Sequence, residues 1–324
     1  MIKKIFYIVF LWGFILSSAY SQQMPLYSQY MMNGFLLNPA VAGSEGYTAV
    51  NLTAREQWIG LPGSPKTHSI SAQTRIMKNS FINKGNSVRI HRKSASRSGR
   101  VGLGGYIFND INGPVSRTGV QVTYAYHIRM QNSQLSFGLS GVGYQFSLNR
   151  EKIKLEEEDE FWNNSPKALF IPDANFGVYF TLPDLYCGIS VYQLFQSSLR
   201  LGEKSYAEYR TLRNYNMMAG YDFHVNDNLT IEPSFLLKTN ENFMVQADIS
   251  SKVIYNEDYW AGLSYRTSGA MIFMGGVRVD KFFFGYAFDY SLSSIMKHSF
   301  GSHELIVVMK LGDNSRRYRW LNRF

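Results

Sequence analysis

The sequence predicts an all-β fold, a transmembrane β-barrel of the outer-membrane type with about 14 antiparallel strands. Aromatic residues make up 15% of the chain, with 22 Tyr and 23 Phe, yet the mean hydropathy is only -0.19. Charged residues make up 18%, below the roughly 25% of ordinary globular proteins. In addition, apolar and polar residues alternate along many segments. A sheet with one face in lipid and one in water has this combination, because alternation averages the hydropathy.

The alternation has a period of two and is clearest at residues 120–129. One face there is apolar and the other mostly polar: Val120, Val122, Tyr124, Tyr126 and Ile128 against Gln121, Thr123, Ala125, His127 and Arg129. The pattern recurs at 214–225, 228–237, 245–254 and 282–290. Met218 is an exception, an apolar residue on a polar face. The length of these segments fits the roughly 9–11 residues of a strand that crosses a membrane.

A soluble β-sandwich would also alternate, but its strands average roughly 5–6 residues. Here the apolar faces are long, and aromatic residues such as Tyr286, Tyr290 and Trp260 gather toward segment ends, as in the girdles at membrane interfaces. The apolar faces carry almost no Lys or Arg, each of which would cost roughly 2–4 kcal/mol at the membrane midplane. The pattern therefore favours the membrane barrel.

Fourteen strands are expected, an even number as in bacterial barrels. They begin near Tyr47, Lys66, Gly102, Thr118, Leu135, Asn175, Cys187, Asn214, Asn228, Met244, Tyr259, Gly269, Phe282 and His303. The fifth is expected to change face near Gly141. The last strand of the barrel (47–311) must pair with the first, because an open edge in lipid leaves backbone groups unpaired.

The first 21 residues are typical of a cleaved secretory signal. Lys3 and Lys4 precede an apolar run at 5–16, and Ala19 and Ser21 form a small-x-small cleavage site. The run is shorter than the roughly 20 residues of a spanning helix. The chain is therefore expected to be exported and to reach the outer membrane.

Residues 22–46 are too rich in Pro, Gly and Asn for a stable helix, and too rich in aromatic residues for a linker without a structural role. An extended chain covers roughly 3.3 Å per residue, so this segment is long enough to cross a barrel lumen. We interpret it as a plug or a periplasmic docking segment; packing under the barrel mouth is the alternative. Its candidate anchoring and turn-forming residues are Tyr27, Tyr30, Phe35, Leu36, Asn38, Pro39 and Gly43.

Positive charge is concentrated on the side of the barrel expected to face the periplasm. The formal net charge is +9, and removing Lys3 and Lys4 with the signal leaves 9 − 2 = +7. The long connection 77–100 has no acidic residue, and the tail 312–324 is also basic. Their candidate contact residues are Arg89, Arg92, Lys93, Arg97, Arg316 and Arg317. They form either a solvated loop and tail or a docking surface for an acidic partner or lipid headgroups. No motif for nucleic acid accompanies them.

Catalytic and metal-binding patterns are weak. Cys187 is the only cysteine, and phosphate loops and hydrolase or metalloprotease motifs are absent from the sequence. The acidic run 156–160 lacks the ligand spacing of a calcium loop. We therefore expect no enzyme and no cofactor. The charged residues expected on the lumen side should form a hydrogen-bonded interior or line water: Asp222, Glu232, Asp248, Lys252, Asp289 and Glu304.

Several stretches resemble one family. They are MPLYSQYMMNGFLLNPAVAG, REQWIGLPGSPKTHSISAQTRI, GLGGYIFNDINGPVSRTGVQVTYAYHI, IPDANFGVYF and GSHELIVV. Together they resemble the PorP/SprF family of outer-membrane barrels of the Bacteroidetes type IX secretion system.

The resemblance implies a non-enzymatic component that binds other secretion proteins, either periplasmic ring lipoproteins or the translocon. Some members of the family resemble the core PorP component and others resemble SprF; for this chain both alternatives stay open, and the SprF-like one implies support for the export and surface attachment of a large adhesin with a type-B C-terminal domain, as in gliding motility. Trp58, in the first outward loop, is a candidate partner contact or else packs under that loop. The alternative function is a channel for small solutes, since a barrel of about fourteen strands is wide enough for water.

Overall fold

The computed structural model describes residues 27–76, 100–149, 168–201 and 207–311. The expected signal (1–21), the acidic run 156–160 and the tail with Arg316 and Arg317 lie outside the described residues. So does the connection 77–99, which holds Arg89, Arg92, Lys93 and Arg97. Within the described ranges, no helix is both long enough and apolar enough to cross a membrane.

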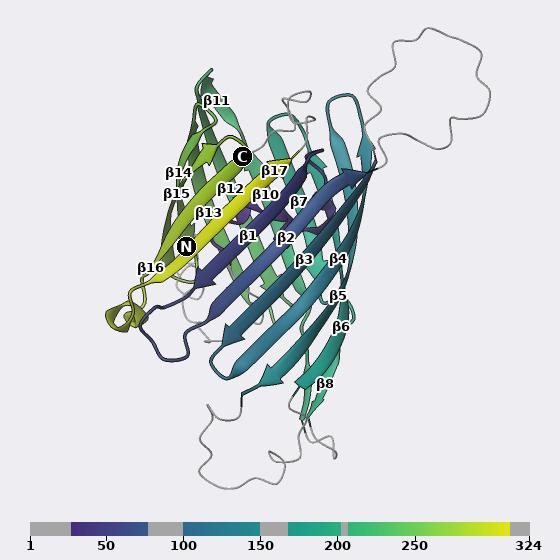
Figure 1. Ribbon diagram of the computed structural model, residues 1–324, viewed down its shortest axis with the longest axis vertical. Helices are drawn as coiled ribbons and strands as arrows, with labels where there is room; N and C mark the ends of the chain where they lie inside the picture. Colours follow the sequence, from purple (N-terminus) through teal and green to yellow (C-terminus); the bar gives the residue numbers. More distant parts are fainter. Residues whose placement is uncertain (1–26, 77–99, 150–167, 202–206, 312–324) are drawn as a thin grey trace, which may run out of the picture.

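Fourteen strands of the described chain form a closed antiparallel barrel, so the predicted fold class and strand number are confirmed (Figure 1). The strands are β1 (Thr48–Glu56), β2 (Lys66–Ile76), β3 (Val101–Asn112), β4 (Val115–Arg129), β5 (Gln134–Leu148), β6 (Ala168–Thr181), β7 (Leu185–Tyr192), β10 (Asn214–Tyr221), β12 (Leu229–Asn240), β13 (Val245–Tyr255), β14 (Tyr259–Arg266), β15 (Ala270–Val279), β16 (Phe282–Ser291) and β17 (Ser302–Leu311). Each pairs with its sequence neighbours, and β1 pairs with β17 to close the wall.

The connections alternate between two ends of the barrel. We call the end that holds the start of β1 and the end of β17 the terminal end, and the opposite one the distal end. Turns at the terminal end include residues 130–133, 182–184, 256–258 and 280–281, all short. The distal end carries longer connections, among them 57–65, 193–213 and 292–301; the last contains the short helix η6 (Ser294–His298).

Three short strands lie outside the simple pattern. The connection 193–213, expected to be a loop, contains a hairpin of β8 (Ser198–Leu201) and β9 (Ala207–Arg210). The strand that begins with β10 is interrupted at Asp222 and continues as β11 (Phe223–Asn226), which pairs with β12. The Asp222 amide instead donates to the carbonyl of Asp184 in the neighbouring turn.

Two sequence expectations are wrong. The sixth strand begins at Ala168 rather than near Asn175, so it includes Pro172. This proline is tolerated because β7 pairs with β6 only from Phe176 onward, which leaves Pro172 paired with β5 alone. The fifth strand also keeps one face inward along its length. What changes near Gly141 is the chemistry of that face, from polar to apolar.

The wall has the expected two faces. On β4, Val122 is 66% exposed on the outside, whereas His127 is fully buried on the inside. Because the outer face is apolar and aromatic over most strands, it suits lipid. The inner face is mostly polar, and its apolar exceptions have partners: Met218 packs in a lumenal cluster with Phe35 and Leu236.

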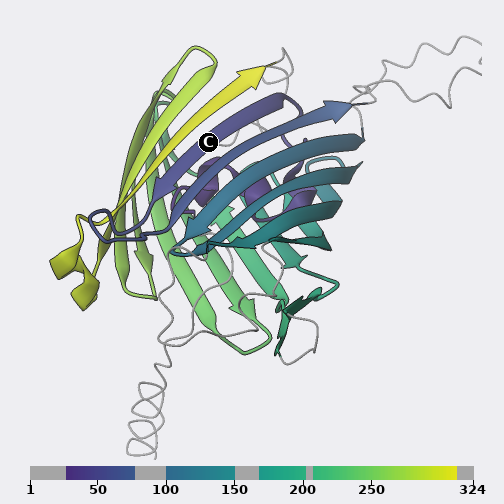
Figure 2. The ribbon, with the colours of Figure 1, turned by 60° about the horizontal axis from the view of Figure 1, so that its bottom comes forward.

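The lumen is occupied by residues 27–46, which we call the inner segment. Three short 3₁₀ helices form most of it: η1 (Tyr30–Met32), η2 (Gly34–Leu36) and η3 (Pro39–Val41). Figure 2 shows these purple turns inside the barrel, surrounded by strands. The main apolar cluster of the protein therefore lies between this segment and the inner wall.

Candidate functional site

The inner segment begins at two carboxylates on the closing strands. The backbone amides of Ser28 and Gln29 donate to the two oxygens of Glu304 on β17, at 2.7 and 2.9 Å. The Ser28 hydroxyl donates to Oδ2 of Asp289 on β16, at 2.7 Å. A carboxylate that accepts from backbone amides forms charge-assisted hydrogen bonds, which are stronger than neutral ones. The start of the segment is thus fixed to the seam of the barrel.

The same carboxylates belong to a buried ion network. Arg55 on β1 lies 2.7 Å from Asp289 and 3.3 Å from Glu304. Arg266 on β14 lies 3.4 Å from Asp289 and 2.9 Å from Asp248 on β13. All five side chains are at most 5% exposed. We call these five residues the seam network.

The buried charges of the seam network stabilise one another as ion pairs. Burying an unpaired charge costs several kcal/mol, so each ion is tolerated only with well-placed partners. Two guanidinium groups face three carboxylates, and the amides of Ser28 and Gln29 supply further donors to Glu304. The wall and the inner segment therefore depend on each other. Nearby, a second buried pair joins Lys252 to Glu232 at 2.6 Å.

Two tyrosines near the start of the segment fix its position in the lumen. The hydroxyl of Tyr27 lies 2.6 Å from that of Tyr106 on β3. The hydroxyl of Tyr30 lies 3.1 Å from Ser234 and donates to Ser250 at 3.1 Å, on β12 and β13. Burial raises the pKa of Tyr27 and of Tyr30 to about 12, so both phenols remain neutral near neutral pH. These contacts join opposite parts of the wall through the segment.

Phe35 is the central apolar contact of the segment. It is fully buried, and it clusters with Leu37, Met218 and Leu236. Fully burying a phenylalanine side chain contributes roughly 1.5–3 kcal/mol. The apolar patch that Met218 and Leu236 form on the inner wall is therefore explained by the segment that covers it. Leu36, also expected to anchor the segment, is half-buried, and its carbonyl accepts from the Tyr192 hydroxyl at 3.0 Å.

Asn38 and Pro39 form the turn that opens η3. The Asn38 side chain accepts from the Ala40 amide at 2.9 Å and so caps η3. Its amide nitrogen also donates to the carbonyls of Val178 and Ile189 on two paired strands, at 2.9 and 3.2 Å. The cap is therefore also a bond to the wall.

Glycines in the wall make room for this turn. A Cβ at Gly138 on β5 would lie 2.3 Å from the Ala40 nitrogen, and one at Gly177 on β6 would lie 2.0 Å from Oδ1 of Asn38. Both distances are far shorter than any non-bonded contact. The segment approaches so closely only because these two wall positions lack side chains.

The end of the segment turns into β1. Gly43 has a φ of 69°, the left-handed conformation that favours glycine, and its amide donates to Oε1 of Gln73. The Ala42 carbonyl accepts from Nε2 of His127 at 3.0 Å. The Ser44 carbonyl accepts from Arg75 at 2.8 Å. This end is thus held by inward side chains of β2 and β4.

The structure brings together only part of the predicted site. Tyr27, Tyr30, Phe35, Asn38 and Pro39 all lie in the inner segment and are buried. Trp58 lies apart from them in the distal connection 57–65. It is half-buried, and its amide donates to the hydroxyl of Ser302 at 3.1 Å.

Sequence reasoning placed Asp248, Asp289 and Glu304 on the lumen side but did not single out Arg55, Arg266 or Ser28. Alternation indicates which way Arg55 points, since it faces inward on β1. Its partners, however, come from strands more than 200 residues away in the sequence. The described residues hold no cluster of three or more His, Cys, Asp or Glu arranged for a metal ion.

A family comparison identifies the chain. Residues 19–309 match the model of the type IX secretion system membrane protein PorP/SprF. The chain belongs to the PorP/SprF family. It is therefore an outer-membrane β-barrel of the type IX secretion system, and membership implies interaction with other components of that system. Family and fold are those of a membrane secretion barrel rather than of an enzyme.

Solved structures share the barrel fold at low sequence identity. A FadL homologue of Pseudomonas aeruginosa is 8% identical, with 89% of this chain and 94% of that chain covered and a TM-score of 0.45. The toluene transporter TodX of Pseudomonas putida is 9% identical, with 91% and 93% covered and a TM-score of 0.43. No curated protein matches the chain significantly in sequence.

Proposed function

We propose that this PorP/SprF protein is a non-enzymatic component that works by binding protein partners, with a lumen closed by its inner segment. One observation supports this best: the segment is tied to the wall along its length, from Ser28 at the seam network to Ser44. A channel for small solutes needs a continuous open path through the lumen. The inner segment, held by these contacts, lies in the middle of that path.

The partners are other type IX secretion proteins, periplasmic ring lipoproteins or the translocon; in the SprF-like alternative a large secreted adhesin with a type-B C-terminal domain is a further partner. The terminal end would face the periplasm, where the basic connection 77–100 and the tail 312–324 offer positive charge to acidic surfaces. The distal end and the outer wall would meet the exported client or the translocon, with Trp58 as a candidate contact.

Affinity purification from native membranes tests the partner-binding role. One variant changes four residues to Gln at once: Arg89, Arg92, Lys93 and Arg97. It should still reach the outer membrane as a barrel, but the recovery of periplasmic partners should fall. A matched variant with Lys66 and Lys297, both at the distal end, changed to Gln should recover them normally. Unchanged recovery by the first variant would contradict a docking role for the connection.

Single-channel recording of the purified protein tests the closed lumen. The intact chain should show no large stable conductance, whereas deletion of residues 22–43 should open one. A large stable pore in the intact protein would overturn the proposal in favour of a small-solute channel. An unchanged conductance after the deletion would show that the segment does not close the path.

A further inference from the structure

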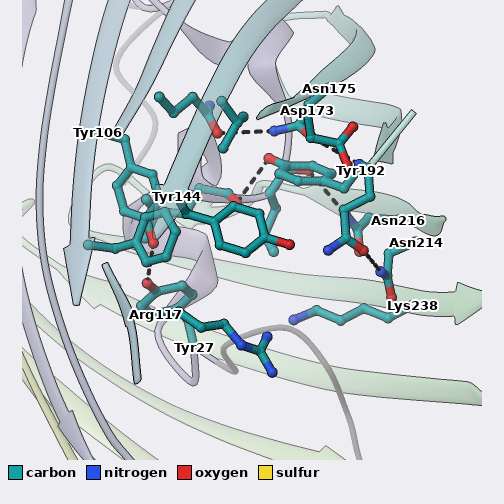
Figure 3. Close-up of a pocket in the computed structure, with 16 residues that line it drawn as sticks. Tyr27, Tyr106, Arg117, Tyr144, Asp173, Asn175, Tyr192, Asn214, Asn216 and Lys238 are labelled. Carbon is teal, nitrogen blue, oxygen red and sulfur yellow. Dashed lines mark hydrogen bonds between the residues drawn. The ribbon is translucent and has the colours of Figure 1, made fainter. Parts of the chain in front are cut away.

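The barrel wall has hollows on its inner and outer faces. The inner hollow lies beside the inner segment (Figure 3). Its tyrosine hydroxyls already have partners: Tyr27 bonds to Tyr106, and Tyr192 donates to the Leu36 carbonyl. The outer hollow is a groove of about 500 Å³ across β17, β1, β2, β3 and β4, which lie toward the viewer in Figure 1. Ligand sites commonly measure roughly 300–1,000 Å³, so the outer groove is large enough for a ligand.

The part of the outer groove nearer the terminal end is apolar. Leu52, Ile70 and Ile107 lie side by side in register on β1, β2 and β3, and all three are exposed. The next pair on this face toward the terminal end is small: Ala72 lies opposite Gly105, where an added Cβ would meet nothing within 4 Å. This part of the groove therefore has room for an acyl chain among apolar side chains.

The part of the outer groove nearer the distal end is polar. His68 on β2 lies opposite Asn109 on β3, which in turn lies opposite Thr118 on β4. The Asn109 side chain donates to Oγ1 of Thr118 at 2.7 Å, which leaves its Oδ1 to accept from a ligand. His68 forms no hydrogen bond or ion pair with another residue that the structure describes. Among the described residues that line the groove, none is Lys, Arg, Asp or Glu.

Tyr286 on β16 indicates where this polar part lies in the membrane. It continues the same row across the sheet, since Tyr286 lies opposite Leu305, Leu305 opposite Ala54, and Ala54 opposite His68. Its ring is exposed on the outer face. Tyrosines on the outside of such barrels gather at the membrane–water interface. The polar part of the groove therefore lies near lipid headgroups, and the apolar part lies toward the acyl chains.

We propose that the outer groove binds a glycolipid, with one acyl chain along Leu52, Ile70 and Ile107 and with sugar hydroxyls bonded to His68 and Asn109. A hydroxyl group both donates and accepts, as a neutral imidazole and a free amide oxygen together require. A phosphate would find no lysine or arginine among the residues that line the groove. A choline headgroup has no N–H or O–H to donate to Oδ1 of Asn109.

Native mass spectrometry of the full-length protein, released from detergent micelles, tests this site. The probe is a galactosyl diacylglycerol, and the match is a phosphatidylcholine with the same acyl chains. We expect saturable binding of the galactosyl lipid, about tenfold tighter than that of phosphatidylcholine, equivalent to about 1.4 kcal/mol. His68→Leu should remove most of this preference. The control His224→Leu makes the same chemical change on β11 at the terminal end and should bind as the unaltered protein does.

A second variant fills the groove itself. Ala54→Phe places a ring in the groove from β1, whereas Ala261→Phe makes the same change on the exposed outer face of β14. Folding of each variant is checked by heat-dependent gel mobility. Loss of galactosyl lipid binding in folded Ala54→Phe, with normal binding in Ala261→Phe, supports the site. The proposal is overturned by equal binding of phosphatidylcholine, by no saturable binding of the galactosyl lipid, or by an unchanged preference in His68→Leu.

Discussion

Arg55 on β1 and Asp289 on β16 lie 2.7 Å apart, although β17 lies between their strands in the sheet. The pair therefore spans the seam where the first and last strands meet. The hydroxyl of Ser28 accepts from Arg55 and donates to Asp289, each at 2.7 Å, so the inner segment takes part in the same contact. Closure of the barrel and filling of its lumen depend on one set of charges.

Removing Arg55 should destabilise the barrel strongly. Arg55→Met leaves Glu304 without its guanidinium partner, and the ion pair that remains to Asp289 is the longer one with Arg266. Breaking a buried pair by deleting one partner costs about 3–5 kcal/mol. Equilibrium unfolding by urea in lipid vesicles measures this loss.

Lys66→Met provides the matched control for that measurement. Lys66 on β2 pairs with Glu56 at 3.0 Å, but the two side chains are 46% and 39% exposed. Exposed pairs contribute about 0–1 kcal/mol, so this variant should unfold almost like the unaltered protein. Similar losses in Arg55→Met and Lys66→Met would contradict the structural importance of the seam network.

A single methyl group on the wall should displace the inner segment. Gly138→Ala places a Cβ 2.3 Å from the Ala40 nitrogen, and that contact involves backbone that cannot move aside. Gly141→Ala on the same strand meets nothing within 4 Å and is the control. We expect channel activity in planar bilayers from Gly138→Ala and none from Gly141→Ala. Equal, low conductance from both would show that the segment accommodates the methyl group.

Strongly alkaline pH should remove the stability that the buried Tyr30 hydroxyl contributes. Burial raises the pKa of Tyr30 to about 12, from its ordinary value of 10.0. A raised pKa contributes stability that is complete below the unfolded value and is lost as pH rises through the folded value. The stability that the Tyr30 hydroxyl contributes should therefore persist up to about pH 10 and disappear between about pH 10 and pH 12.

Tyr30→Phe isolates that contribution. Below pH 10 it should unfold more easily than the unaltered protein by about 1 kcal/mol, because the bonds to Ser234 and Ser250 are lost. Above pH 10 the difference should shrink and then reverse, since phenylalanine does not ionise. Urea titrations at several pH values measure the difference, and a constant gap up to pH 12 would contradict the pKa assignment.

Much of the wall was predictable because a strand's period of two is a local property. Residues such as Val122 and His127 on β4 took the faces that alternation assigns. Met218 broke the pattern because the inner segment covers it, a relationship that no local window contains. The predicted change of face near Gly141 was wrong because the inward residues beyond it are apolar. They include Tyr144, which joins a lumenal cluster with Ile171, a contact that no local window contains either.

The site was less predictable than the wall. The acidic members of the seam network could be placed on the lumen side, but their partners could not, because the pairing of Arg55 with Asp289 joins residues 234 positions apart. Such pairs follow from the register of closed strands and from the path of the inner segment. Alternation fixes a side chain's face but not its neighbour across the lumen.

The outer face of β4 gives a direct test of lipid contact. Val122 stands at the middle of Val115–Arg129 and is 66% exposed. Val122→Arg should cost about 2–4 kcal/mol if this position lies at the membrane midplane, because the charge must leave water. Thr118→Arg lies on the same strand and face but near the distal end, where the cost falls to about 0–1 kcal/mol. Urea titration of both variants in phosphatidylcholine vesicles measures the costs, and equal costs would contradict the depth assigned to β4.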